Sequence, residues 1–144
     1  MAEKFSILLI EDDSDDVELL QEAFENSNLK VEMNVIPNGS LAVEYIQSCS
    51  SCPDIIVMDY NLPKVHGREV LLELKKATTF KNVPVVILTT SSVKQDMEYA
   101  YENGADKFLV KPITLEEMKC TVSIIADLVK SYSISCFLLL NFLF

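Results

Sequence analysis

Apolar runs of strand length alternate with amphipathic stretches of helix length along most of this chain, which is the pattern of a parallel sheet covered by helices. The predicted strands cover residues 5–10, 31–36, 54–58, 83–88 and 107–110. Residues 55–58 and 85–88 are apolar at consecutive positions, as in central strands buried on both faces. Between and after the strands lie five segments with a helical period of about 3.6, and each is predicted to bury one apolar stripe on the sheet. The stripe of the fourth segment consists of Val93, Met97, Ala100 and Tyr101. We therefore predict a doubly wound α/β domain with five strands and five helices.

The composition fits a single domain with an acidic surface. The chain has 144 residues, 49% of them hydrophobic, which supplies enough apolar side chains for one buried core. Its 22 acidic and 12 basic residues give a formal net charge of −10. This balance argues against nucleic-acid binding, which needs clustered Lys and Arg. The N-terminus resembles no secretory signal, so we expect a reducing cytoplasm, with the C-x-x-C pair Cys49 and Cys52 as free thiols.

Local signals mark several helix ends. Thr114 with Glu117, and Ser92 with Gln95, have the spacing of a capping box at a helix N-terminus. Gly104 follows a helical stretch and is expected to adopt the left-handed conformation that ends many helices.

The C-terminal end does not fit the alternating pattern. Residues 136–144 are apolar except for Asn141, but nine residues are too few to cross a bilayer, which takes about 20. We expect the domain to cover residues 4–131 and an apolar tail to cover 132–144. Packing of the tail on its own domain or on a partner subunit is favoured. An unstructured or cloning-derived end and a membrane-surface anchor are the alternatives.

Polar residues follow the strands where they end. In an open parallel sheet these ends meet at one rim, where ligands bind. Carboxylates about 4 Å apart repel by roughly 4 kcal/mol at an effective dielectric near 20, so an acidic cluster there calls for a cation. Oxygen ligands from Asp12 and Asp59 suit Mg²⁺, which keeps part of its hydration shell. The residues expected at the rim are Glu11, Asp12, Asp13, Asp59, Thr89 and Lys111.

These residue types suit phosphoryl transfer, which depends on positioning and charge neutralisation. Asp59 ends a buried central strand and is the natural nucleophile, while Lys111 and Thr89 provide a cationic clamp and a hydroxyl donor. The acidic residues further along are predicted to form a solvated helix surface, with the first two favoured by the helix dipole. They are Asp15, Asp16, Glu18, Glu22 and Glu25.

Four stretches together resemble the CheY-like receiver domain of two-component response regulators. They read ILLIEDD (7–13), DIIVMDYNLP (54–63) followed by Gly67, PVVILT (84–89) and GADKFLVKP (104–112). The resemblance implies a flavodoxin-like fold with strand order 2-1-3-4-5. The sequences of residues 59–63 and 80–84, with no output domain, resemble stand-alone regulators, including those that pair with bacterial phytochromes.

The resemblance also implies a role for each matching residue. Asp59 accepts a phosphoryl group from the phosphohistidine of a sensor histidine kinase. Asp12, Asp59 and the backbone carbonyl of Asn61 bind Mg²⁺, and Glu11 acts through water. Thr89 donates a hydrogen bond to the phosphoryl group, and Lys111 pairs with it.

The resemblance further implies how the signal leaves the site. A cis bond joins Lys111 to Pro112, and Phe108 is an aromatic switch that turns inward as Thr89 moves. The change then appears on the face formed by the helix around 93–101, the strand 107–110 and the helix 115–129. There it is read by a downstream protein or by a second copy in a homodimer, without a membrane span.

Two residues depart from the family pattern, and two other functions compete. His66 replaces a more usual acidic or amide residue and is predicted to be a surface residue, and Phe108 lacks the tyrosine hydroxyl of many members. The alternative function is a Mg²⁺-dependent phosphohydrolase that uses Asp59, as haloacid-dehalogenase-like enzymes do. Those place a second aspartate where this chain has Asn61. A flavin carrier is disfavoured because acidic residues 11–13 would repel a phosphate. We therefore expect no enzyme beyond self-catalysed phosphorylation and dephosphorylation.

Overall fold

The computed structural model describes residues 4–143, and within them five parallel strands form one sheet in the order β2-β1-β3-β4-β5. The strands are β1 (Lys4–Ile10), β2 (Lys30–Ile36), β3 (Ile55–Met58), β4 (Val85–Thr89) and β5 (Lys107–Val110). The helices are α1 (Ser14–Glu25), α2 (Gly39–Ser48), α3 (Gly67–Lys76), α4 (Lys94–Glu102) and α5 (Leu115–Leu143). The predicted fold class and strand order are confirmed.

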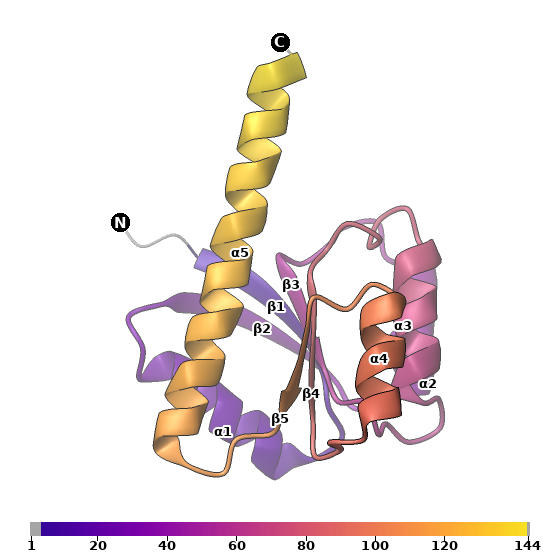
Figure 1. Cartoon of the computed structure of the whole chain (residues 1–144), viewed down its shortest axis with the longest axis vertical. Coiled ribbons are helices and arrows are strands. Elements are labelled where there is room, and N and C mark those ends of the chain that lie inside the picture. Colours follow the sequence, from indigo (N-terminus) through magenta and orange to yellow (C-terminus); the bar gives the residue numbers. More distant parts are fainter. Residues whose placement is uncertain (1–3, 144) are drawn as a thin grey trace.

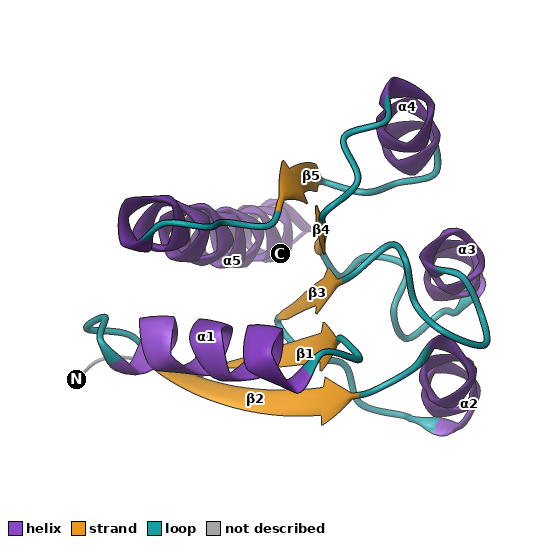
Figure 2. Cartoon of the chain, turned by 90° about the horizontal axis from the view of Figure 1, so that it is seen from below, coloured by secondary structure: helices purple, strands orange, loops and turns teal. Residues whose placement is uncertain are grey.

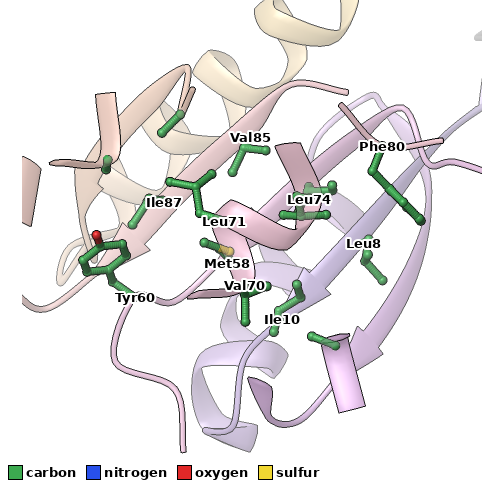
Figure 3. Close-up of a cluster of buried hydrophobic side chains, with 14 of the residues drawn as sticks. Leu8, Ile10, Met58, Tyr60, Val70, Leu71, Leu74, Phe80, Val85 and Ile87 are labelled. Atoms are coloured by element: carbon green, nitrogen blue, oxygen red, sulfur yellow. The ribbon is translucent and has the colours of Figure 1, made fainter. Parts of the chain in front are cut away.

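The helices cover both faces of the sheet. Figure 2 shows α1 and α5 on one face and α2, α3 and α4 on the other. Successive side chains of a strand point to opposite faces, so Val57 faces α1 and α5 whereas Met58 faces the other layer. Figure 3 shows Met58 and its strand neighbours meeting Leu71 and Leu74 of α3. The consecutive apolar runs thus fill two cores.

The strand boundaries differ slightly from those predicted. β4 begins at Val85 rather than residue 83 and includes Thr89. Thr89 pairs with Val110 of β5, and its carbonyl accepts a hydrogen bond from the N–H of Lys111 at 2.8 Å. Pairing with β5 therefore holds Thr89 in the sheet, directly at its rim.

The helix ends bear out two of the three predicted signals. The Thr114 hydroxyl accepts from the N–H of Glu117 at 3.1 Å, and the Glu117 carboxylate accepts from the N–H of Ile113 at 2.9 Å. Gly104 has a φ of 99°, as expected. The prediction for Ser92 is wrong, because α4 begins one residue later than that cap requires. Val93 is its N-cap, without a side-chain hydrogen bond.

The predicted apolar stripe of α4 is only partly buried. Ala100 is fully buried, whereas Val93, Met97 and Tyr101 are exposed. Figure 2 shows α4 beside the β4–β5 edge of the sheet, so only a narrow part of the helix faces the core. The expectation that the whole stripe packs on the sheet is therefore wrong, and an apolar surface remains on α4.

The last helix is much longer than the domain requires. α5 has 29 residues, or about 43 Å at 1.5 Å per residue. The helical backbone continues without a break past residue 131, and Figure 1 shows its C-terminal turns extending beyond the sheet and the other helices. The Tyr132 hydroxyl donates to the Asp106 carboxylate at 2.5 Å and ties α5 to the start of β5. No helix in the described residues has both the length and the apolar character needed to cross a membrane.

Candidate functional site

Three carboxylates meet at the rim, as predicted. Glu11 and Asp12 follow β1, Asp59 follows β3, and one oxygen of each lies within 4.8 Å of the other two. Adjacent β1 and β3 fix this arrangement, because the N–H of Asp59 donates to the carbonyl of Ile10 at 3.0 Å. Glu11 and Asp59 are only 5% and 7% exposed, whereas Asp12 is open to solvent.

The Lys111 ammonium compensates the charge of these carboxylates. Its Nζ lies 2.5 Å from Oε1 of Glu11, 2.6 Å from Oδ2 of Asp16 and 3.0 Å from Oδ2 of Asp59. Lys111 follows β5, and its largely buried side chain reaches across the rim. One cation thus holds side chains from three separate segments.

The assignment of Asp16 to a solvated surface is wrong. Its carboxylate turns toward Lys111. The Asp13 carboxylate accepts from the N–H of Asp15 at 2.9 Å and starts α1 at the rim. The first turn of α1 therefore places Asp16 in the site. Its position four residues after Asp12 was the sequence signal that could have predicted this. The other acidic residues assigned to the surface, Asp15, Glu18, Glu22 and Glu25, are exposed.

Burial and charge shift two pKa values in the cluster. Burial raises the pKa of Glu11 to about 7; the Asp59 charge adds to this increase, and the hydrogen bond and charge of Lys111 oppose it. For Lys111, burial favours the neutral form, but hydrogen bonds to Asp16, Glu11 and Asp59 outweigh it and raise its pKa. Glu11 therefore holds a proton mainly below about pH 7, and a bound cation would displace it.

The remaining predicted rim residues contact one another. Thr89 is fully buried, and its Oγ1 accepts from the Asn61 side-chain amide at 3.4 Å and from the N–H of Ser91 at 3.3 Å. The N–H of Asn61 donates to Oδ1 of Asp59 at 3.1 Å. The structure thus brings together every residue predicted for the metal and phosphoryl sites.

Phe108 lies away from the rim. Its ring is buried and packs edge-to-face on Tyr60 with the centroids 5.8 Å apart. Its N–H donates to the Tyr101 hydroxyl at 3.0 Å. The ring already faces the core in this structure. The expectation of a cis bond before Pro112 is wrong, because this bond is trans, the form that proline bonds intrinsically favour.

His66 and Gly67 fix the loop after Asp59. His66 is exposed, as predicted, but it also caps α3, because its Nδ1 accepts from the N–H of Arg68 at 3.0 Å. The N–H of Gly67 donates to the carbonyl of Tyr60 at 2.9 Å, and a Cβ at Gly67 would lie 2.6 Å from that oxygen. Only glycine allows α3 to start this close to the Asp59 backbone. The capping role of His66 was not predicted, although a polar residue directly before Gly67 was a signal for it.

The donor set fits a divalent cation. Hard cations such as Mg²⁺ prefer oxygen ligands, and three carboxylates converge here while only Asp12 is open to water. Burial is the main cause of the raised pKa of Glu11, and a cation bound at this place would offset the Asp59 charge that adds to it. Cys49 and Cys52 lie outside this site and are free thiols.

Comparison with known proteins identifies the family. Residues 7–123 match the response regulator receiver domain. The chain belongs to this family. The receiver domain is 37% identical over 117 residues to the response regulator Rcp1 of Synechocystis, with 78% of this chain and 80% of Rcp1 covered. It is also 35% identical over 127 residues to FilR2 of Methanothrix harundinacea, a methanogenesis regulatory protein by name, with 85% and 82% covered.

Solved structures agree with this assignment. The Mn²⁺-bound form of Rcp1 is 36% identical and has a TM-score of 0.75, with 84% of this chain and 91% of that chain covered. The phosphorylated cyanobacterial phytochrome response regulator RcpA is 34% identical and has a TM-score of 0.79, with 90% and 96% covered. The receiver domain is thus similar to stand-alone response regulators, including one of the phytochrome-associated type.

Proposed function

We propose that this receiver domain accepts a phosphoryl group on Asp59 from the phosphohistidine of a sensor histidine kinase and signals through protein contacts. The observation that carries this function is the position of the buried Asp59 carboxylate between two other carboxylates and the Lys111 ammonium. Receiver domains are signalling modules, so self-catalysed phosphorylation and dephosphorylation is the only chemistry proposed.

Each rim residue has a role in this transfer. A carboxylate oxygen of Asp59 attacks phosphorus as the bond from phosphorus to the histidine nitrogen breaks. The Lys111 ammonium pairs with a phosphoryl oxygen, and the Thr89 hydroxyl donates to another, which offsets the charge brought next to the carboxylates.

Magnesium is the proposed cofactor. Asp12, Asp59 and the backbone carbonyl of Asn61 would hold it, with Glu11 acting through water. When bound, the ion neutralises negative charge shared by the carboxylates and the phosphoryl oxygens. The Mn²⁺-bound structure of Rcp1 supports a divalent ion in a relative of this kind.

The alternative of a phosphohydrolase is less well supported. Such an enzyme needs a general acid two residues after the nucleophile, where this chain has Asn61. An amide cannot supply that proton, and here its nitrogen donates to Thr89.

Exposed apolar residues support two contact surfaces. Leu19, Ile113 and Leu115 are exposed and lie around one surface hollow that Pro112, the residue after Lys111, also lines. We assign this surface to the phosphodonor protein, which has to approach Asp59. Val93, Met97, Tyr101 and Val110 are exposed on α4 and β5, on the face proposed for a downstream protein or a second copy. The similarity to the phytochrome response regulator RcpA favours a phytochrome as the kinase. The cytoplasm, predicted from the sequence, stays the proposed location.

The domain proposed from the sequence covers residues 4–131, and the tail covers 132–144. Because α5 continues past the domain, we assign its apolar end to contact with a second copy rather than with its own sheet. A helix that is apolar on all sides needs such a partner in water.

A labelling experiment tests the function. A small phosphodonor with Mg²⁺ should add one acid-labile phosphoryl group to the protein, and Asp59→Asn should abolish the labelling in intact mass spectra. Asp127→Asn, which changes an exposed carboxylate on α5, is the matched control and should label normally. Equal labelling of wild-type and Asp59→Asn protein would disprove the proposal.

A further inference from the structure

A chain of polar contacts leads from Thr89 to the surface between α3 and α4. The N–H of Ser91 donates to Oγ1 of Thr89 at 3.3 Å, and the Ser91 hydroxyl donates to Oδ2 of Asp96 at 3.0 Å. The other oxygen of Asp96 lies 3.5 Å from Nη2 of Arg68 on α3. The residue expected to contact a phosphoryl group is thus connected to a guanidinium on another helix.

Arg68 is held loosely in this position. Its side chain is 45% exposed, and its Cζ lies 4.3 Å from the centre of the Tyr99 ring. Ion pairs and cation–π contacts at such exposed positions contribute little stability. The guanidinium can therefore exchange these partners for another at small cost.

A second partner is close to Arg68. The Tyr60 ring is fully buried, and its hydroxyl has no hydrogen-bond partner; no other buried side-chain polar atom in the described region lacks one. Figure 3 shows this ring, with its oxygen, at one end of the buried cluster. Burial raises the pKa of Tyr60, and the guanidinium of Arg68 opposes this increase through its charge and its hydrogen-bonding approach to the hydroxyl, although the two groups do not meet in a hydrogen bond of normal geometry. An unpaired buried hydroxyl costs stability, which a charged donor would recover.

We propose that Arg68 exchanges Asp96 for the Tyr60 hydroxyl when Asp59 is phosphorylated, and so acts as a positioning residue for Thr89. This inference rests on the proposed phosphoryl transfer. Movement of Thr89 toward the phosphoryl group carries Ser91 with it. This weakens the hydrogen bond from the Ser91 hydroxyl that holds the Asp96 carboxylate in place beside Arg68. The Arg68 guanidinium then donates to the hydroxyl of Tyr60, the residue that directly follows Asp59 in the chain.

The exchange gives Thr89 two positions, and in each of them a different contact of Arg68 stabilises the protein. The pair between Asp96 and Arg68 favours the position seen here, and the new hydrogen bond to Tyr60 favours the moved one. A ligand shifts such an equilibrium by its preference for one state. The surface between α3 and α4 thereby changes with phosphorylation.

The sequence makes this exchange directly observable, because Arg68 is its single arginine. One Nε–Hε signal in an NMR spectrum therefore reports on Arg68. We would record it with Mg²⁺ alone and with Mg²⁺ and beryllium fluoride, which mimics a carboxylate-bound phosphoryl group. The signal should shift in wild-type protein at saturation, and Tyr60→Phe should abolish that shift.

Two further variants complete the test. Tyr99→Phe removes a hydroxyl but keeps the ring under Arg68, so the shift should persist. Asp96→Asn weakens the present ion pair, so the signal without beryllium fluoride should already approach its position in the saturated wild type. This second variant keeps the proposal testable if Tyr60→Phe does not fold.

Failure of this inference can be told apart from failure of the proposed function. An Arg68 signal that does not move, or that moves equally in Tyr60→Phe, overturns the exchange while labelling of Asp59 leaves phosphoryl transfer intact. Absence of labelling at Asp59 would overturn both.

Discussion

The Nζ atom of Lys111 lies 3.0 Å from Oδ2 of Asp59. The ammonium is therefore already beside the carboxylate that is to carry the phosphoryl group, and it must change partners when that group arrives. Lys111→Ala should still be phosphorylated, but phosphorylation should no longer change dimerisation, because the group that senses the new charge is gone. Intact mass and light scattering measure the two properties.

Lys30→Ala is the matched control for this prediction, since Lys30 is exposed on β2, at the opposite edge of the sheet from β5. It should behave like the wild type. A Lys111→Ala protein that dimerises normally when phosphorylated would contradict the assigned role.

The raised pKa of Glu11 predicts a pH dependence of stability. In metal-free protein this pKa is about 7 against 4.5 for the ordinary group. Between these values the unfolded chain releases the proton while the folded chain keeps it, so the free energy of unfolding should fall as pH rises from about 4.5 to 7, by about 3 kcal/mol at most. Urea unfolding in a chelator measures this slope, and Glu11→Gln should remove it.

Metal binding should show the opposite dependence on pH. Mg²⁺ requires a deprotonated site, so its affinity should increase as pH rises toward about 7. Titration calorimetry at pH 5.5 and 7.5 measures this change. An affinity that is the same at both values would mean that Glu11 does not interact with the metal.

The bond between Tyr132 and Asp106 predicts a second stability effect. Burial and the Asp106 carboxylate raise the pKa of Tyr132 to about 12. Below pH 10 the Tyr132 hydroxyl is protonated in both the folded and the unfolded chain, so its bond to Asp106 contributes fully to stability. This contribution is lost as pH rises from 10 to 12. Tyr132→Phe should lower the free energy of unfolding by about 1 kcal/mol at pH 8, and by less at pH 11. Denaturant unfolding at both pH values checks this.

Removal of residues 136–144 tests the assignment of the C-terminal turns. The truncated protein should be monomeric under conditions in which the full chain dimerises, as measured by light scattering. Leu138→Lys, at an exposed position of this segment, should weaken the dimer in the same direction. An unchanged oligomeric state in the truncated protein would show that the segment is not an interface.

The alternation of apolar segments was enough to predict the fold class, because runs that are apolar at consecutive positions are typical of strands buried on both faces of a parallel sheet. The strand order followed from the resemblance to receiver domains. The positions of Glu11, Asp12 and Asp59 followed from strand ends. Asp16 was missed because its role depends on where α1 begins relative to the rim, which the N-cap decides. The exposed stripe of α4 was missed because periodicity shows that a helix has an apolar face but not whether the sheet extends far enough to cover it.

Gly67 places the first turn of α3 directly on the backbone of Asp59 and Tyr60. The loop that carries the nucleophile is consequently ordered during folding, before any ligand arrives. Binding then does not have to fix that backbone, so little of the binding free energy is lost as conformational entropy. The same contact leaves no room for a side chain at position 67. A larger residue there would disorder the loop and so reduce ligand affinity, although every residue that contacts the ligand would be unchanged.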